Sequence, residues 1–271
     1  MKDLKREITI MAGVIAFALI AITVLGFNKF NSLKFSSAAE TKEIIEEEKV
    51  EFSLKTTAMN TEGKKKVAID AGHQLHSDSS TEPVGPGSST KKAKVAGGAT
   101  GVATGVPEYQ LNLDVAKKLR KELLDRGYEV YMIRSKNNVN ISNKKRAVKA
   151  NKSGSDIYIR LHGDSSSSSS VTGASALYPS TSNPYVSKLS KKSYKLSKAI
   201  IDSYCKETGI KNRGCVVRDD LTGTNWSKIP VTLIEMGFMS NSAEDKKMQK
   251  KSFQNRMASG IADGIDAYFG Y

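Results

Sequence analysis

The stretch that decides the fold is Lys66-Val67-Ala68-Ile69-Asp70-Ala71-Gly72-His73. Its short apolar run is typical of a strand that is covered on both faces, as in a parallel sheet. Gly72 allows a sharp turn without a side-chain clash, and His73 then follows at the carboxyl end of the strand. In open α/β sheets, ligands and reacting groups gather beyond the carboxyl ends of the strands. His73 is therefore a candidate for chemistry, although a histidine at a strand end more commonly serves as hydrogen-bonded structure.

Strands and helices alternate after this stretch. A helix is predicted from Glu108, strands over 128–133 and 156–162, and a helix between those strands over 142–152. The second of these strands ends at His162. Such alternation favours a parallel sheet with right-handed crossovers. The expected fold class is α/β: a twisted, mostly parallel sheet flanked by helices on both faces, in a single domain over residues 64–271.

The remaining segments complete this pattern. A helix over 184–208, a last strand over 229–234 and a terminal helix over 252–269 are predicted, and the last strand ends at Glu235. The polar, glycine-rich stretch 74–107 lies between His73 and Glu108 and is expected to be a loop. Long loops inside a domain are commonly functional, so this stretch is a candidate wall of a cleft.

The amino terminus carries a targeting signal. Residues 8–27 form an uncharged apolar run that is long enough to cross a bilayer, and three basic residues precede it. The positive-inside rule predicts a cytoplasmic tail over 1–7, a transmembrane anchor over 8–27 and an extracytoplasmic stalk over 28–63. The alternative is a cleaved signal peptide ending near Ser37-Ala38-Ala39. The expected location is thus the bacterial cell membrane with the domain outside, or the cell wall after cleavage.

The formal net charge of +14 at pH 7 indicates polyanionic surroundings. No nucleic-acid-binding motif stands out and the lysines are scattered, so no nucleic-acid partner is expected. A membrane face and anionic cell-wall polymers remain as candidate partners. Cys205 and Cys215 either form a disulfide that closes a short loop or are two unpaired thiols, and their spacing is not a metal-binding pattern.

Three strand ends thus offer His73, His162 and Glu235, and the helix after the long loop begins with Glu108. Two neutral imidazoles and one carboxylate are the ligand set of a catalytic zinc that keeps a fourth position for water. An additional acidic group, not bound to the metal, is what such a site needs as general base. The residues therefore predict zinc-dependent hydrolysis.

Four motifs in order carry a family resemblance: Ile69-Asp70-Ala71-Gly72-His73, Glu108-Tyr109-Gln110-Leu111-Asn112-Leu113, Ile159-Arg160-Leu161-His162-Gly163-Asp164, and Ile234-Glu235-Met236-Gly237-Phe238-Met239-Ser240-Asn241. Over about 67–269 the chain resembles the zinc-dependent N-acetylmuramoyl-L-alanine amidases of the amidase-3 type. The resemblance implies that His73, Glu108 and His162 bind zinc and that Glu235 is the catalytic glutamate. It also implies peptidoglycan as the substrate and the amide between N-acetylmuramic acid and L-alanine as the bond cleaved.

Further residues are candidates for supporting roles. Arg218, Asn225 and Trp226 are predicted substrate contacts, and Asp70 and Arg134 are expected to orient their neighbours through hydrogen bonds. Two other functions stay open. One is a zinc peptidase that acts within the peptide stem of peptidoglycan, and the other is a membrane-tethered wall-binding module with a degenerate site.

Overall fold

The computed structural model describes residues 64–271. The predicted basic tail, membrane anchor and stalk over 1–7, 8–27 and 28–63 therefore lie outside the described residues. Within residues 64–271, no helix has the length and apolar character needed to cross a membrane.

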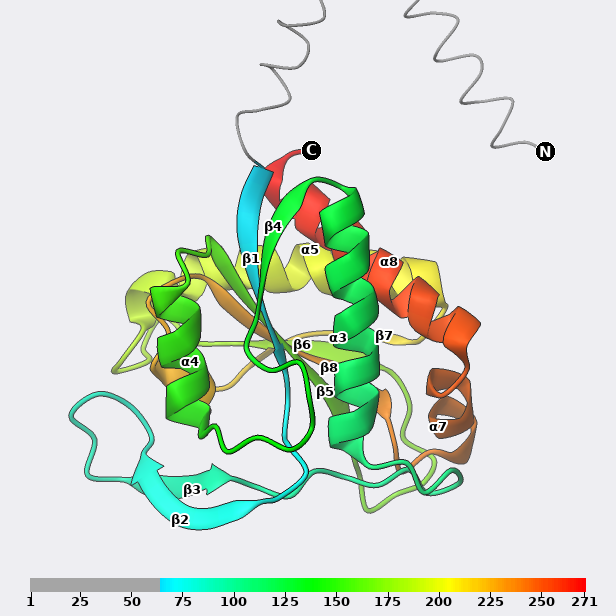
Figure 1. Ribbon diagram of the computed structural model, residues 1–271, viewed down its shortest axis with the longest axis horizontal. Coiled ribbons are helices and arrows are strands. Elements are labelled where there is room, and N and C mark those ends of the chain that lie inside the picture. The colour runs from blue at the N-terminus through cyan, green and yellow to red at the C-terminus, as the bar shows by residue number, and fades with distance from the viewer. Residues whose placement is uncertain (1–63) are drawn as a thin grey trace, which may run out of the picture. The chain divides into compact units, whose positions relative to one another are not determined.

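A six-stranded sheet organises the described part of the chain (Figure 1). Its spatial order is β4-β1-β5-β8-β6-β7, and β6 pairs with β8 in antiparallel orientation while the other neighbours are parallel. The expected fold class, a mostly parallel α/β sheet, is confirmed. The strands are β1 (Lys64–Ala71), β4 (Tyr128–Met132), β5 (Ile157–Asp164), β6 (Ala174–Tyr178), β7 (Asn212–Val217) and β8 (Val231–Phe238).

Helices cover both faces of this sheet. The larger apolar core lies between one face and three long helices, α3 (Glu108–Asp125), α5 (Ser190–Thr208) and α8 (Lys251–Phe269). A smaller cluster lies between the other face and α4 (Asn143–Lys152). The short helices are η1 (Ser187–Leu189), α6 (Thr222–Asn225) and α7 (Ser242–Met248).

β1 occupies the interior position that its sequence predicts. It pairs in parallel with β4 on one side and with β5 on the other. Val67 and Ile69 belong to the larger core, whereas Ala68 between them belongs to the smaller cluster on the opposite face. Because side chains alternate between faces along a strand, this apolar run is buried on both sides.

The helix starts also follow local signals. Pro107 immediately precedes α3, where its missing N–H costs nothing. The Ser142 hydroxyl caps α4 by accepting a hydrogen bond from the Lys145 backbone N–H. The first cap places Glu108 in the first turn of α3, at the edge of the sheet where β1 and β5 end.

Three details differ from the sequence predictions. The stretch 74–107, predicted as loop throughout, contains a hairpin of β2 (Asp78–Pro83) and β3 (Lys91–Val95). Its strands are polar because the ribbon lies at the surface, so they lack the alternation of a half-buried strand. The helix predicted from residue 184 begins later, after η1, and the last strand continues past Glu235 to Phe238.

Candidate metal centre

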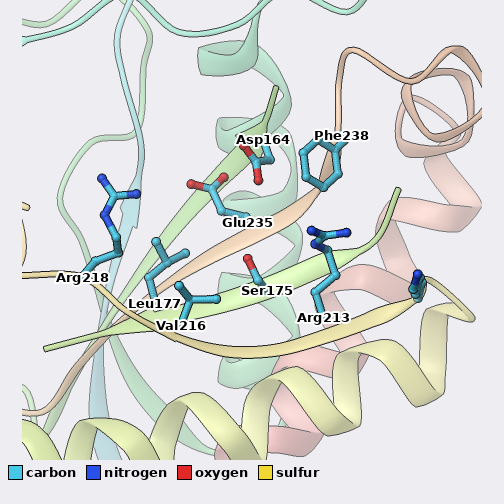
Figure 2. Close-up of a pocket in the computed structure, with 9 residues that line it drawn as sticks. Asp164, Ser175, Leu177, Arg213, Val216, Arg218, Glu235 and Phe238 are labelled. Atoms are coloured by element: carbon cyan, nitrogen blue, oxygen red, sulfur yellow. The ribbon is translucent and has the colours of Figure 1, made fainter. Parts of the chain in front are cut away.

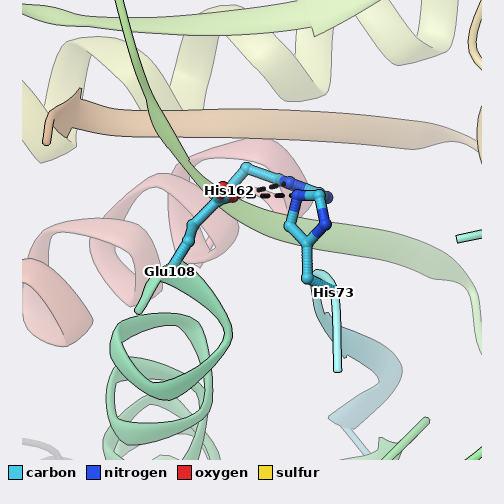
Figure 3. A group of neighbouring side chains, drawn as sticks. All are labelled: His73, Glu108 and His162. Atoms are coloured by element: carbon cyan, nitrogen blue, oxygen red, sulfur yellow. Dashed lines mark hydrogen bonds and ion pairs between the residues drawn. The ribbon is translucent and has the colours of Figure 1, made fainter. Parts of the chain in front are cut away.

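The structure brings His73, Glu108 and His162 together (Figure 3). One candidate ligand atom from each lies within 4.8 Å of the others. His73 follows β1, Glu108 begins α3, and His162 lies near the end of β5. β1 and β5 run in parallel with Ala71 opposite Leu161, so the residues that follow these two positions are neighbours. The cluster predicted from the sequence is thus assembled at the carboxyl edge of the sheet.

His73 is held in an unusual backbone conformation. Its φ of 56° is positive, which is rare for a residue with a side chain and costs on the order of 1–3 kcal/mol. Two contacts stabilise this turn: Arg146 Nη2 donates to the His73 carbonyl at 2.9 Å, and the Gly72 N–H donates to Leu161 O at 2.9 Å. The His73 ring donates from Nδ1 to Ala96 O at 2.9 Å. This hydrogen bond fixes the tautomer and leaves Nε2 facing Glu108, 3.2 Å from Oε1.

Glu108 is the buried carboxylate between the two rings. Its Oε1 lies 3.0 Å from His162 Nδ1 and also accepts from the Gly163 N–H at 3.1 Å. Its Oε2 accepts from the Ala99 N–H at 2.8 Å. Burial opposes ionisation, but the hydrogen bond that His162 Nδ1 donates to Oε1 outweighs it and holds the pKa of Glu108 well below its usual range. The group is therefore an anion at neutral pH.

His162 is largely enclosed, with a side chain that is less exposed than that of His73. Burial lowers the pKa of His162 to about 4, which keeps its imidazole neutral at pH 7. Its ring lies against the backbone of Gly72, where a Cβ would approach Nε2 to 2.3 Å. Nε2 is buried and has no hydrogen-bond partner within residues 64–271.

These donors fit a single divalent cation. Neutral imidazoles and a carboxylate are the ligands that zinc takes in hydrolytic sites. Ligand atoms about 2.0–2.1 Å from a tetrahedral zinc lie roughly 3.3 Å apart. The separations of Glu108 Oε1 from the two imidazole nitrogens, 3.0 and 3.2 Å, agree with that spacing. The His73 tautomer also turns a lone pair toward an anionic oxygen, an arrangement that a cation between them would stabilise.

Glu235 lies beside this cluster and outside it. It is opposite His162 in the pairing of β5 with β8. Its side chain is half-buried, and Oε2 is fully buried without a hydrogen-bond partner in the described part of the chain. Burial, together with the negative charges of Glu108 and Asp164, raises the pKa of Glu235 well above its usual value. A raised pKa makes the ionised carboxylate a stronger base, which suits a group that takes up a proton and later returns it.

A pocket of about 410 Å³ opens at Glu235 (Figure 2). Asp164 and Arg218 line it, as does Arg213 of β7. Arg218, a predicted substrate contact, therefore does lie at this pocket. Sequence reasoning missed Asp164 and Arg213: Asp164 directly follows the His162-Gly163 pair, whereas nothing in the sequence around Arg213 marks it.

The other two predicted substrate contacts lie elsewhere. Asn225 is fully buried and donates to Asp219 O at 2.8 Å. The Trp226 ring donates from Nε1 to Pro83 O at 3.0 Å, and the Lys144 ammonium lies 4.1 Å from its centroid. Neither residue lines the pocket at Glu235.

Two residues expected to orient their neighbours do so. Asp70 accepts hydrogen bonds from Arg146, Arg160 and the Tyr158 hydroxyl. Arg134 donates to the carbonyls of Ala71, Gly72 and Tyr109. These contacts hold the backbone that leads into His73. Cys205 and Cys215 are both free thiols.

Comparison with known proteins gives a consistent picture. A family model described as N-acetylmuramoyl-L-alanine amidase matches residues 67–267. N-acetylmuramoyl-L-alanine amidase LytC of Bacillus subtilis (strain 168) is 27% identical over 168 residues, which are 62% of this chain and 32% of LytC. Probable cell wall amidase LytH of Staphylococcus epidermidis is 25% identical over 162 residues, 60% of this chain and 50% of LytH. The chain thus spans half or less of the length of these two relatives.

Solved structures share the fold. N-acetylmuramyl-L-alanine amidase Ami1 of Mycobacterium smegmatis superposes with a TM-score of 0.70 at 24% identity, over 77% of this chain and 98% of that one. The catalytic domain of CwlV, an N-acetylmuramoyl-L-alanine amidase from Bacillus (Paenibacillus) polymyxa var. colistinus, gives a TM-score of 0.61 at 27% identity. That match covers 76% of this chain and 98% of the CwlV domain.

Proposed function

Because this chain belongs to the N-acetylmuramoyl-L-alanine amidase family, we propose that it hydrolyses the amide between N-acetylmuramic acid and L-alanine in peptidoglycan. The observation that carries the proposal is the cluster of His73, Glu108 and His162 with Glu235 beside it. In this proposal the first three residues hold a zinc ion, and Glu235 is the general base and acid.

Each of these residues has a distinct task. A zinc ion held by the three side chains would supply Lewis acidity toward the scissile carbonyl and toward water. Glu235 Oε2, which has no hydrogen-bond partner within residues 64–271, is available to take a proton from the attacking water. The same oxygen then returns the proton to the amine that leaves. General acid–base catalysis of this kind contributes about 10²–10⁴-fold in rate.

The surrounding residues keep the ligands in place. Arg146 and Arg134 donate to the carbonyls of the turn that carries His73, and the Gly163 N–H donates to Glu108. Mutation of groups that orient metal ligands through hydrogen bonds typically lowers metal affinity or activity by about 10–100-fold.

Product analysis tests the proposal. Purified muramoyl peptides are incubated with the protein and the products are identified by mass spectrometry. Amide hydrolysis releases a peptide with amino-terminal alanine and leaves the free lactyl carboxyl on the sugar. A new amino terminus inside the peptide would instead support the zinc peptidase. No cleavage at all, with binding retained, would support the wall-binding module.

A further inference from the structure

The wall of the pocket at Glu235 has two kinds of charge. Glu235 and Asp164 supply carboxylates, whereas Arg213, Arg218 and Lys211 supply cations. In Figure 2 the two carboxylates lie between the guanidinium groups of Arg218 and Arg213. No ion pair joins either arginine to either carboxylate in the described part of the chain. Neither carboxylate of the pocket therefore neutralises Arg213 or Arg218.

A bulge in β7 turns Arg213 toward the pocket. Between two pairings with β6, at Asn212 and Cys215, β7 contributes one residue more than its partner. The extra residue is accommodated at Gly214, whose φ of 79° suits glycine. Side chains alternate along a regular strand, so Arg213 and Val216 would otherwise point to opposite faces. The bulge lets both line the same pocket.

The Arg213 side chain is held in place while most of its donors stay free. Its methylene stem lies over Gly173, where a Cβ would approach Arg213 Cγ to 2.7 Å. Its guanidinium carbon lies 5.4 Å from the Phe238 ring centroid, and Nη1 donates to Thr172 O at 3.2 Å. Within residues 64–271 it makes no ion pair, which leaves four of the five N–H donors of an arginine without a partner. An exposed arginine ordered in this way is prepared to bind an anion.

Arg218 is already neutralised in part. Its Nε and Nη2 donate to Asp220 at 2.7 and 3.0 Å. Lys92 shares the same carboxylate at 2.8 Å. Lys211, by contrast, has no ion pair in the described part of the chain. The anion-binding end of the pocket is therefore at Arg213 and Lys211.

We propose that Arg213, with Lys211 beside it, binds a free carboxylate of the peptide that leaves when the amide is hydrolysed. This inference rests on the proposed function. Around the scissile amide the sugar side carries neutral hydroxyl and acetamido groups, whereas the peptide side carries carboxylates. The released peptide has an ammonium at one end, which Glu235 and Asp164 attract, and carboxylates further along, which Arg213 attracts.

The distance across the sheet fits this arrangement. β7 lies two strand positions from β8, which carries Glu235. Two strand spacings are roughly 10 Å, and an extended peptide advances about 3.3–3.6 Å per residue. The carboxylate bound by Arg213 therefore belongs to one of the first three residues of the leaving peptide.

A set of matched substrates tests the inference. N-acetylmuramoyl tripeptides are prepared with all carboxylates free or with one at a time converted to a carboxamide, and kcat/KM is measured with the full chain. Conversion of the one carboxylate that Arg213 binds should lower kcat/KM about tenfold, which is the effect expected from the loss of one charge-assisted hydrogen bond. Arg213→Gln should lower kcat/KM about tenfold on the free-carboxylate substrate and abolish the difference between substrates. Arg120→Gln, which removes an exposed arginine on α3, should change neither.

A binding measurement separates the inference from the proposed function. The released tripeptide is titrated calorimetrically into Glu235→Gln protein with and without Arg213→Gln. Binding that weakens about tenfold without Arg213 supports the inference even if hydrolysis proves to occur at another bond. Equal hydrolysis of all the substrates, or a preference that survives Arg213→Gln, overturns the inference and leaves the amidase proposal intact. If the protein neither hydrolyses any of the substrates nor binds the peptide, both the inference and the amidase proposal are overturned.

Discussion

At the scale of single residues, the metal centre depends on glycine as much as on its ligands. The absence of a side chain at Gly72 leaves the space that the His162 ring occupies. Gly98 leaves space for Glu108 in the same way, because a Cβ on Gly98 would lie 2.9 Å from Glu108 Oε2. Neither glycine has a positive φ, so the requirement is for space. The sequence draws attention to His73 and His162, but the need for these two glycines is visible only in three dimensions.

Gly72→Ala is predicted to weaken the metal centre. The added Cβ would meet the His162 ring at 2.3 Å and force the ring to move. We expect metal affinity to fall about 10–100-fold, as for other changes that disturb the orientation of a ligand. Metal titration of the purified protein measures the effect. Gly97→Ala is the matched control, since nothing lies within 4 Å of its Cβ, and equal affinities for the two variants would contradict the prediction.

Glu235→Gln is predicted to separate activity from stability. The rate should fall about 10²–10⁴-fold because the proton acceptor is lost. The metal-free protein should nevertheless become more stable, by about 1 kcal/mol, because a buried carboxyl close to two other acidic groups is removed. Denaturant unfolding in the presence of a chelator measures this change. Glu129→Gln, at an exposed site on β4, should stay within about 0.5 kcal/mol of the parent, and a Glu235→Gln protein less stable than the parent would refute the interpretation.

At the scale of elements, the strands and the residues at their ends were predicted best where the strands are buried on both faces and run in parallel. Val67–Ile69 and Ile157–Ile159 are apolar runs because both faces of β1 and β5 are covered. Their parallel direction then brings His73 and His162 to one edge, so the candidate ligands could be found from sequence. The β2–β3 hairpin was not predicted because its polar, mostly exposed strands show no hydrophobic alternation. The β7 bulge was not predicted because β7 is also mostly exposed, so the shift in its side-chain alternation leaves no hydrophobic signal in the sequence. Arg213 was missed for the same reason.

Asp70 connects three elements and is predicted to be a major source of stability. It lies fully buried between Arg146 of α4 and Arg160 of β5, at 2.7 and 3.1 Å. Asp70→Asn should lower the free energy of unfolding by about 3–5 kcal/mol, because it leaves two buried guanidinium groups without their anion. Chemical denaturation measures the loss. Asp125→Asn, which breaks only an exposed pair on α3, should cost less than about 1 kcal/mol, and equal losses would contradict this account.

Asp70 should also make the free energy of unfolding depend on pH. Burial opposes its ionisation, but the charges of Arg146 and Arg160 prevail and hold the pKa of Asp70 well below its ordinary 3.8. A lowered pKa in the folded state gives stability that is complete above the unfolded-state value and is lost as the pH falls toward the folded-state value. Between about pH 5 and pH 2, the parent should therefore lose stability more steeply than Asp70→Asn. Parallel curves of unfolding free energy against pH for the two proteins would show that the argument is wrong.

At the scale of the whole molecule, we propose that residues 8–27 hold the domain at the outer face of the membrane. The proposal is supported by the apolar run and the basic residues before it, all outside the described residues. We predict that the full chain sediments with membranes, whereas a chain that begins at Lys64 does not. Recovery of the full chain in the soluble wall fraction, shortened near Ala39, would favour the cleaved signal peptide instead.

Charge is the second proposed targeting device. The net charge of +14 should attract the protein to anionic wall polymers, and ions screen such attraction over about 10 Å at 0.1 M salt. Binding of the chain from Lys64 onward to purified walls should therefore weaken as salt is raised. Binding that does not change with salt would remove charge as the explanation.

The central claim is that His73, Glu108 and His162 hold a zinc ion while Glu235 acts beside it. Elemental analysis of purified variants tests it most directly, because metal content distinguishes a ligand from a base in one measurement. His73→Ala and His162→Ala are each predicted to lose the bound zinc, and Glu235→Ala is predicted to keep one zinc per chain while losing activity. Zinc retained by both histidine variants, or lost from Glu235→Ala alone, would contradict the account.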